Sequence, residues 1–558
     1  MKIRTLSPAL LLLIFGACAP MAEAPQSVGA SAAGAPAISV ETLREVTRTL
    51  SSDEFEGRAP GTRGEELTVA LLAQRFEAAG LQPGNGGSWY QNVPLVEITA
   101  DPATAAFSYQ SATGETPLAY GSDIVLWTKR VVPQIDVSDA EMVFVGYGIN
   151  APERGWNDYE GVDMEGKIAV ILVNDPDYQN TTNDGTFDGR AMTYYGRWTY
   201  KYEEAARQGA AGAIIVHDTE PAAYGWSVVE SSWTGPQLDQ DAPDNHMDRI
   251  PVEGWISNDA ARALFAAAGQ DLAAMSAAAR RPGFRAVPLG LTGAAHLNNS
   301  IRREASRNVV GILPGATRPD EYVLYTAHWD HLGRCTPDAS GDDICNGALD
   351  NATGTAGLVA LAEAHAAAGP AERSLVFLAV TAEESGLLGS GYYADNPVFP
   401  LAQTVGGINM DGLNITGPTR DVVVVGGGKS ELEAILATEV AAQHRVIQPE
   451  PSPEKGYFYR SDHFTLARRG VPMLYAESGE DLLRGGTVAG HAAAEDYTVN
   501  RYHAPGDEYD PSWNWDGAIA DLRLYFNIGR DLANSAAWPN WYPDAEFRAA
   551  RDASRAGR

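Results

Sequence analysis

From residue 308 onward, short apolar runs alternate with helical patterns, and this alternation restricts the chain to few folds. Helical patterns are expected at 353–367 and 516–534. The expected strands are rich in apolar and β-branched residues and lie at 308–313, 322–326, 374–380, 404–409 and 471–475. Strands that alternate with helices are typical of a parallel sheet covered on both faces. We therefore predict an α/β fold, a three-layer sandwich around a mainly parallel central sheet.

A second region, 118–290, has a different texture. Its β-branched runs are short and bounded by Gly, Asp and Asn, with one helix expected at about 199–208. A chain of 558 residues is also too long for one hydrophobic core. We predict a separate β-rich domain at 118–290, inserted between an N-terminal part (38–117) and the remainder (291–545) of the main domain. Residues 546–558 are predicted to be an untethered tail.

The N-terminus has the pattern of a targeting segment. Basic residues precede an apolar run at 9–15 that is too short to span a bilayer. The run closes in Phe-Gly-Ala-Cys, which resembles a bacterial lipobox, so we favour a signal peptide at 1–17, lipidation of Cys18 and a flexible tether at 18–37. Ordinary signal cleavage after Ala24 is the alternative. Either way we expect export, as a periplasmic or outer-membrane lipoprotein or, alternatively, as a secreted protein.

Charge limits the classes of partner. The formal net charge of −31 argues against nucleic acid and against anionic lipid, so a membrane contact is expected only through the lipid anchor. A negative field mildly favours cationic ligands such as metal ions and free amino termini. The same acidity is explained equally well as a means of keeping an exported protein soluble.

The chain contains only three cysteines. With Cys18 assigned to processing, Cys335 and Cys345 remain in one predicted loop of an exported protein. A disulfide between them is expected in an oxidising compartment. Metal binding by this pair is the weaker alternative, because a structural zinc site needs a second pair of ligands.

Candidate metal ligands follow the predicted strands. Ligands of open α/β sheets bind at the carboxyl ends of the strands. The polar side chains found there, or in the loops before the two helices, are His328, Asp330, Asp350, Glu383, Glu384, Asp411 and His503. Imidazole and carboxylate without thiolate suit zinc or a similar divalent ion. The sequence therefore predicts a metal centre at one rim of the sheet.

The segments around these residues resemble a known family, the co-catalytic dizinc exopeptidases, which include bacterial secreted aminopeptidases and the glutamate carboxypeptidase group. The resemblance covers nearly all of the mature chain. It rests on His328-Trp-Asp, Gly347-Ala-Leu-Asp-Asn-Ala-Thr-Gly, Thr381-Ala-Glu-Glu-Ser-Gly-Leu-Leu-Gly-Ser, Asn409-Met-Asp-Gly, Arg460-Ser-Asp-His-Phe and Tyr502-His. The region 118–290, with its Phe144-Val-Gly-Tyr-Gly run, resembles the protease-associated (PA) domain often inserted in these enzymes.

This resemblance implies two zinc ions, or similar divalent ions, and a ligand set. Asp350 would bridge both ions. His328 and Asp411 would complete one site, and Glu384 and His503 the other. Two such ions lower the pKa of a shared water and polarise the scissile carbonyl.

The resemblance also implies roles for residues that do not bind metal. Glu383 would be the general base. Asp330 would hold the His328 ring in one tautomer. Tyr457 or Tyr459 would stabilise the transition state, and the sequence does not choose between them.

The expected activity is removal of the N-terminal residue from peptide substrates. A zinc carboxypeptidase of the same fold is the alternative, with arginines at 460, 468, 469 and 484 available for a terminal carboxylate. A non-catalytic receptor-like protein and a single-zinc glutaminyl-cyclase-like enzyme are further rivals. The complete ligand set speaks against the first, and the resemblance of 118–290 to an inserted PA domain speaks against the second. No oligomeric state is predicted.

Overall fold

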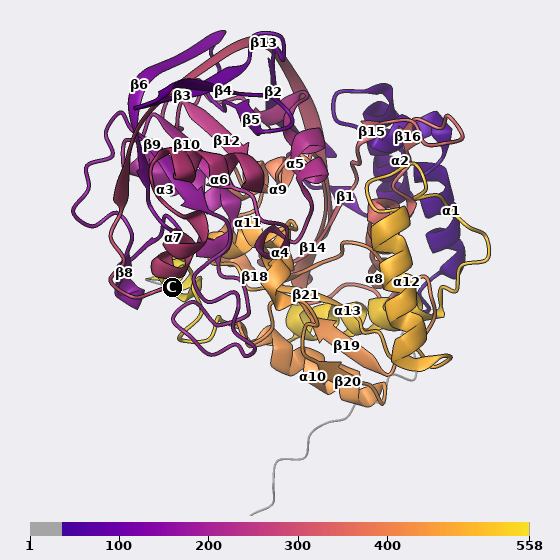
Figure 1. Cartoon of the computed structure of the whole chain (residues 1–558). Coiled ribbons are helices and arrows are strands. Elements are labelled where there is room, and N and C mark those ends of the chain that lie inside the picture. Colours follow the sequence, from indigo (N-terminus) through magenta and orange to yellow (C-terminus); the bar gives the residue numbers. More distant parts are fainter. Residues whose placement is uncertain (1–35, 557–558) are drawn as a thin grey trace, which may run out of the picture. The chain divides into compact units, whose positions relative to one another are not determined.

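A computed structural model describes residues 36–556 (Figure 1). The predicted signal peptide, Cys18 and the alternative cleavage site after Ala24 lie outside the described residues. Among residues 36–556, no helix combines the length and the apolar character needed to cross a membrane.

Four parallel strands form the centre of the main sheet. Their order is β17–β14–β18–β21, and every neighbouring pair is parallel. The strands are β14 (Arg318–His328), β17 (Arg373–Val380), β18 (Thr404–Asn409) and β21 (Met473–Ser478). Beyond β17, the sheet continues through antiparallel pairs with β13 (Val287–Leu313), β2 (Tyr90–Ala100) and β11 (Gln237–Gln240). Beyond β21, it continues through the antiparallel strand β19 (Asp421–Val424), and β20 (Val446–Gln448) pairs parallel to β19.

Helices cover both faces of this sheet, as alternate side chains of β14 show. Leu324 packs in a cluster with Tyr393 of α9 (Leu388–Asp395) and Leu466 of α11 (His463–Arg468). The next residue, Tyr325, faces the other way, and its hydroxyl contacts His365 Nε2 of α8 (2.9 Å) and donates to the Tyr525 carbonyl of α13 (2.8 Å). The prediction of an α/β fold with a largely parallel sheet and helices on both faces is confirmed.

Two of these helices, α8 and α13, form where the sequence predicted them. Helix α8 spans Gly354–Ala367 and α13 spans Asp516–Asn534. The N-terminal helices α1 (Val40–Leu50) and α2 (Arg63–Ala78) pack against α8. Thr42 of α1 donates a hydrogen bond to Glu363 of α8 (2.7 Å). The other described helices are α3 (Trp198–Arg207), α4 (Thr219–Ala222), α5 (Trp226–Trp233), α6 (Asn258–Ala267), α7 (Leu272–Ala279), α10 (Leu432–Ala442), α12 (Gly486–Asn500) and α14 (Arg548–Arg555).

A second, β-rich region is connected to the main sheet through β13. The N-terminal half of this long strand pairs antiparallel with β3 and β6, and its C-terminal half pairs with β2 and β17 (Figure 1). The strand order is β4–β3–β13–β6–β9–β10–β12–β5. The strands are β3 (Ala106–Ser111), β4 (Gly114–Leu118), β5 (Ile124–Trp127), β6 (Gln134–Phe144), β9 (Ile168–Leu172), β10 (Gly212–Val216) and β12 (Val252–Ile256). Strand β3 lies before residue 118 and β4 ends at it, and the domain limits 118 and 290 stay predictions.

The C-terminal segment is a docked helix, so the prediction of an untethered tail at 546–558 is wrong for residues 548–555. Helix α14 buries Arg551, whose guanidinium donates to the backbone carbonyls of Thr404 (2.9 Å) and Val405 (3.2 Å). The composition of the segment is polar, which is why the sequence was interpreted as a tail. Together with Arg555, which donates to the Ala402 carbonyl (3.1 Å), the buried Arg551 fixes the helix to the start of β18.

Candidate metal centre

The loops at the carboxyl ends of three parallel strands converge. His328 is the last residue of β14, Glu383 and Glu384 follow β17, and Asp411 follows β18. Asp350 lies in the irregular helical turn Ala348–Thr353 that leads into α8, and His503 lies in the loop after α12.

The two carboxylate oxygens of Asp350 face two different histidines. Its Oδ1 lies 3.4 Å from His328 Nε2, and its Oδ2 lies 3.3 Å from His503 Nε2. On the first side, His328 Nε2 is also 3.1 Å from Asp411 Oδ1. On the second side, His503 Nε2 is 3.1 Å from Glu384 Oε2. The structure thus brings together all five predicted ligands, with one oxygen of Asp350 in each half.

The electrostatics of the five groups favour binding of a positive charge. Against the effect of burial, Glu384 and Asp350 raise the pKa of His503 to about 10. Asp411 and Glu383 likewise raise the pKa of His328 well above its ordinary value, again against burial. The two rings in turn hold the pKa of Asp350 well below its usual range despite burial. Imidazole nitrogens and carboxylate oxygens converge within 4.8 Å in the group His328, Asp350, Asp411. Such a donor set fits divalent cations of the zinc class.

Asp330 contacts different groups from those expected. His328 Nδ1 donates to the Asp330 backbone carbonyl (3.2 Å), whereas the Asp330 carboxylate is 3.8 Å away. That carboxylate accepts the backbone N–H groups of Glu383 (3.1 Å) and Glu384 (3.4 Å). The carbonyl therefore fixes the His328 tautomer with Nε2 toward the centre, and the Asp330 carboxylate anchors the loop that carries both glutamates.

His331 is a functional residue that the sequence interpretation missed. It is buried, and its Nδ1 lies 2.6 Å from Glu384 Oε1, on the oxygen that does not face His503. His331, Asp350 and Glu384 form a second group of donor atoms within 4.8 Å. The sequence signal was the position of His331, three residues after His328, but spacing alone does not distinguish a packing residue from one that orients a ligand.

Asp507 was missed as well. Its carboxylate is buried and accepts the backbone N–H groups of Leu349 (2.9 Å) and Asp350 (3.1 Å), together with the Tyr497 hydroxyl (3.2 Å). Asp507 therefore holds the turn that presents Asp350. Its only sequence signal is its position four residues after His503.

Arg58 connects the N-terminal part of the chain to two ligand loops. The side chain is fully buried and donates to four backbone carbonyls: Leu50 (2.7 Å), Trp329 (2.8 Å), Asn346 (2.7 Å) and Gly347 (2.9 Å). Burial lowers the pKa of Arg58 to about 10, although Asp330 and Asp507 act in the opposite direction. The Arg58 charge lies beside the acidic centre. Its hydrogen bonds fix the backbone after His328 and the backbone before Asp350.

Glu383 lies beside the centre. Its carboxyl oxygen lies within 4.8 Å of donor atoms of His328 and Glu384. Burial and the neighbouring carboxylates of Asp411 and Glu384 raise the pKa of Glu383 well above its ordinary value, while His328 opposes them. A raised pKa makes the Glu383 carboxylate a better proton acceptor, as a general base requires.

The two candidate tyrosines differ in orientation. The Tyr459 hydroxyl donates to Glu546 (3.0 Å), and the side chain is buried. Tyr457 is partly exposed, and its ring lies 5.2 Å from the Arg460 guanidinium carbon. Of the two candidate tyrosines, Tyr457 is therefore the one whose hydroxyl does not bind Glu546.

Cys335 and Cys345 form a disulfide with Cα atoms 5.9 Å apart. The bond closes the loop between β15 (Gly333–Arg334) and β16 (Ile344–Cys345), which form a small antiparallel pair. Gly57 packs against this loop so closely that a Cβ there would lie 2.4 Å from the Cys345 carbonyl oxygen. The disulfide loop thus packs against the segment that carries Arg58.

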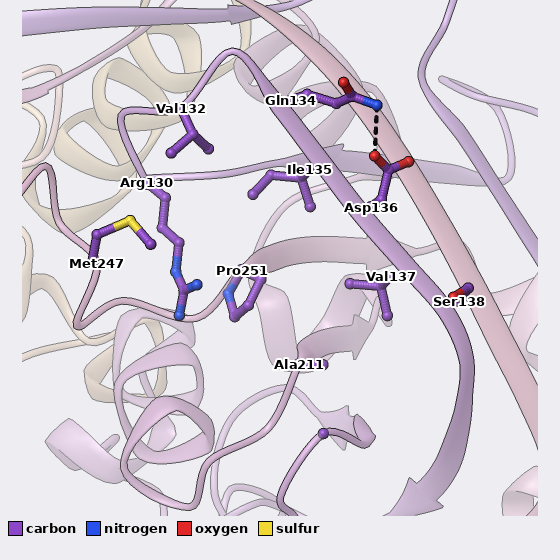
Figure 2. Close-up of a pocket in the computed structure, with 11 residues that line it drawn as sticks. Arg130, Val132, Gln134, Ile135, Asp136, Val137, Ser138, Ala211, Met247 and Pro251 are labelled. Carbon is purple, nitrogen blue, oxygen red and sulfur yellow. Dashed lines mark hydrogen bonds between the residues drawn. The ribbon is translucent and has the colours of Figure 1, made fainter.

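A cavity of about 480 Å³ lies in the β-rich region and not at the metal centre (Figure 2). Its lining includes Arg130, Met247 and the strand segment 134–138, where Gln134 donates to Asp136 (2.6 Å). None of the five predicted ligands lines it. The cavity offers no cluster of imidazole and carboxylate groups, so the candidate site remains the centre around Asp350.

The family model described as Peptidase family M28 matches residues 308–527, a span that contains all five predicted ligands. Residues 308–527 form a peptidase family M28 domain. The family expected from the sequence motifs is thus confirmed for the M28 domain. The PA resemblance of 118–290 stays a prediction.

Two curated relatives of the M28 domain are Aminopeptidase NAALADL1 of Mus musculus and of Rattus norvegicus. Each is 31% identical to this chain over 139 residues, which is 23% of this chain. The match spans only 17% of the length of either relative. A solved structure, the aminopeptidase from Aneurinibacillus sp. strain AM-1, aligns with a TM-score of 0.51 at 19% identity, over 90% of this chain and 95% of that one. This likeness shows that the fold extends over most of both chains.

Proposed function

We propose that this protein is a zinc-dependent aminopeptidase that removes the N-terminal residue from peptides. The observation that carries the proposal is Asp350, which presents one carboxylate oxygen to His328 and the other to His503 within an M28 domain. The two curated relatives and the protein of the aligned structure are named as aminopeptidases, which supports the choice of aminopeptidase over carboxypeptidase.

Two zinc ions would be held by the five residues that the structure brings together. His328 and Asp411 would serve one ion, Glu384 and His503 the other, and Asp350 both. When bound, the ions supply Lewis acidity that acidifies water and polarises the scissile carbonyl. The pairing of each imidazole with two carboxylates in the structure favours this division of the ligands.

Glu383 would move the proton. Its carboxylate would take a proton from the attacking water at Oε and deliver it to the nitrogen of the leaving amine. The buried neighbourhood that raises the pKa of Glu383 favours the protonated carboxyl group that forms in this transfer.

Three neighbours would keep this machinery in place. Asp330 fixes the backbone of Glu383 and Glu384, His331 orients Glu384, and Asp507 fixes the backbone at Asp350. Partners of this kind commonly change metal affinity or activity by 10- to 100-fold when they are removed.

Aminoacyl chromogenic substrates, assayed beside carboxyl-terminal ones with and without chelator, test the proposal. We expect hydrolysis of aminoacyl substrates, loss of activity with chelator and recovery on addition of zinc. Hydrolysis confined to the carboxyl-terminal substrates would favour the carboxypeptidase instead. Absence of any hydrolysis by zinc-loaded protein would favour a non-catalytic binding protein.

We also propose that the protein acts outside the cytoplasm, attached to a membrane through Cys18 or secreted. The disulfide between Cys335 and Cys345 supports this location, because such bonds persist mainly in oxidising compartments. Metabolic labelling with a fatty-acid analogue, compared between the wild-type chain and Cys18→Ala, distinguishes lipidation from ordinary signal cleavage.

A further inference from the structure

A groove in the β-rich region runs along an unpaired edge of strand β6. On one side, residues 134–141 of β6 pair with β13, whereas on the other side β6 pairs with β9 only over Met142–Phe144. The cavity of about 480 Å³ shown in Figure 2 is lined by residues 134–138 of β6 and by Gly166 and Ala211, which lie just before β9 and β10. The groove therefore occupies the place that a further strand beside β6 would take.

The register of β6 directs free backbone groups into this space. The Asn299 N–H donates to the Pro133 carbonyl (2.8 Å). Hydrogen-bonded pairs alternate along an antiparallel ladder, so from 133 to 137 the odd-numbered residues bond to β13. The N–H and C=O groups of the even-numbered residues Gln134 and Asp136 consequently point to the open edge. Among the residues that the structure describes, no strand pairs with them there, and an edge of this kind is a template for a further strand.

Alternate side chains of β6 give the groove an apolar lining. The side chains of Gln134 and Asp136 bond to each other on one face of the strand (2.6 Å), so Ile135 and Val137 lie on the other face. Met247 borders the groove and is 49% exposed, which is unusual for a large apolar side chain. The apolar residues that line the groove are Val132, Ile135, Val137, Ala211, Met247 and Pro251.

Arg130 provides a positive charge at the wall of the groove opposite β6. Its Nε donates to the Arg249 carbonyl (2.7 Å), and the side chain lies beside Met247 and Pro251 (Figure 2). Within residues 36–556, the guanidinium forms no salt bridge, and its two terminal nitrogens donate to no other group of the protein. Free guanidinium donors bind carboxylates through charge-assisted hydrogen bonds.

Charge favours a peptide over a second copy of this chain as the occupant. Two chains that each carry a net charge of −31 repel each other. Asp136 and Asp139 are exposed on this part of β6, and they would add to the repulsion if the β6 strands of two copies paired. A short peptide brings a single terminal carboxylate, which Arg130 can bind.

We propose that this groove binds the C-terminal segment of an extended peptide, which adds to β6 as a further strand. An apolar side chain of the peptide would pack against Ile135, Val137 and Met247, and the terminal carboxylate would bind Arg130. In this mode of recognition, main-chain hydrogen bonds supply affinity and side-chain pockets supply specificity. None of the five predicted metal ligands lines the groove, so binding there needs no metal ion.

Fluorescence anisotropy with the zinc-loaded full chain measures this binding. The probe is Thr-Val-Thr-Val-Ala-Val with fluorescein on its N-terminus, which removes the free amino terminus that an aminopeptidase needs, and with a free C-terminus. A second probe carries a C-terminal amide, and two further probes carry N-methyl groups on one or the other alternate set of backbone nitrogens. We expect the amide and one of the two N-methylated probes to have a Kd about ten-fold or more higher, because they lose the charge-assisted bond or the strand pairing.

Substitutions in the groove should weaken binding of the unmodified probe. Arg130→Gln should raise the Kd about ten-fold and remove the preference for the acid over the amide, and Arg130→Lys should raise it less. Met247→Ala should raise the Kd about three- to ten-fold through lost apolar contact. The matched controls lie outside the groove: Arg285→Gln, whose arginine pairs with Glu160, and Val228→Ala, whose valine is 44% exposed on α5. Both should leave the Kd unchanged.

Several outcomes would overturn the proposal and leave the peptidase function standing. Absence of binding, or equal affinity for all four probes, would exclude strand addition at β6. An unchanged Kd in both Arg130→Gln and Met247→Ala would place the peptide elsewhere, and loss of binding after chelation of the zinc would assign it to the metal centre. A dimer in sedimentation that the probe dissociates would assign the groove to a second copy. If Arg130→Gln does not fold, Arg130→Lys and Met247→Ala decide the question.

Discussion

Glu383 and Glu384 are adjacent and chemically identical, yet they have different neighbours. Glu384 contacts His503 and His331 through its two oxygens, whereas the carboxyl group of Glu383 makes neither contact. Their backbones are fixed by the same side chain, Asp330. The proposed roles of Glu384 as metal ligand and Glu383 as proton carrier therefore depend on where each side chain points from one shared anchor.

This division predicts different effects for two substitutions. Glu383→Gln should retain both metal ions and lower kcat by about 10²-fold or more with little change in KM, because only the proton acceptor is lost. Glu384→Gln should weaken metal binding, and excess zinc should partly restore its activity. Metal content and steady-state kinetics of both variants check this. Loss of metal from Glu383→Gln with retention in Glu384→Gln would mean that the roles are reversed.

Asp507 provides a second prediction at this scale. Asp507→Ala leaves the buried N–H groups of Leu349 and Asp350 without an acceptor, which should cost about 2–4 kcal/mol of stability. Zinc affinity should fall by about 10- to 100-fold because Asp350 loses its fixed position. Urea unfolding and competition with a zinc chelator measure the two effects. Asp507→Asn, which keeps one acceptor oxygen, should be less damaged, and zinc affinity unchanged in both variants would refute the positioning role.

At the scale of elements, α14 shows how a polar segment becomes part of the fold. Arg551→Met keeps most of the apolar stem but removes the donors to the Thr404 and Val405 carbonyls. We expect a loss of about 1–3 kcal/mol in the free energy of unfolding. Asp552→Asn, on the exposed side of the same helix, is the control and should change stability by less than about 0.5 kcal/mol. Equal stability of both variants would show that α14 contributes nothing to the fold.

The β13 strand is the element that unites the two sheet regions. Its C-terminal half borders β17, from which the catalytic loop with Glu383 emerges, and its N-terminal half borders β3 and β6. Strand β11, from the region 118–290, pairs with β2 in the main sheet as well. These pairings join the β-rich region to the main sheet at two places, through β13 and through β11.

At the scale of the whole molecule, the residues at the rim of the parallel sheet could be predicted from the sequence. The side chains that hold the surrounding backbone in place could not. Strand β17 is buried throughout and is apolar from residue 375 to residue 380, so the first charged residues after it, Glu383 and Glu384, mark the rim. Asp507, Arg58 and Arg551 bond instead to backbone groups of distant loops. Such bonds depend on the path of the folded chain, which no local pattern in the sequence records.

The acidity of the chain also acts at this scale. A net charge of −31 attracts cations. In the centre around Asp350, carboxylates lie beside two imidazoles, and both kinds of group can bind a metal cation. Metal binding to the native state should therefore raise stability by mass action.

Zinc titration of the metal-free protein tests the central claim most directly. Aliquots of zinc are added to chelator-treated protein, and bound metal and aminopeptidase activity are measured at each step. Two ions per chain should bind at saturation, with activity rising to a plateau by the second equivalent. A plateau at one ion per chain, or full activity without metal, would contradict a centre in which Asp350 serves two ions.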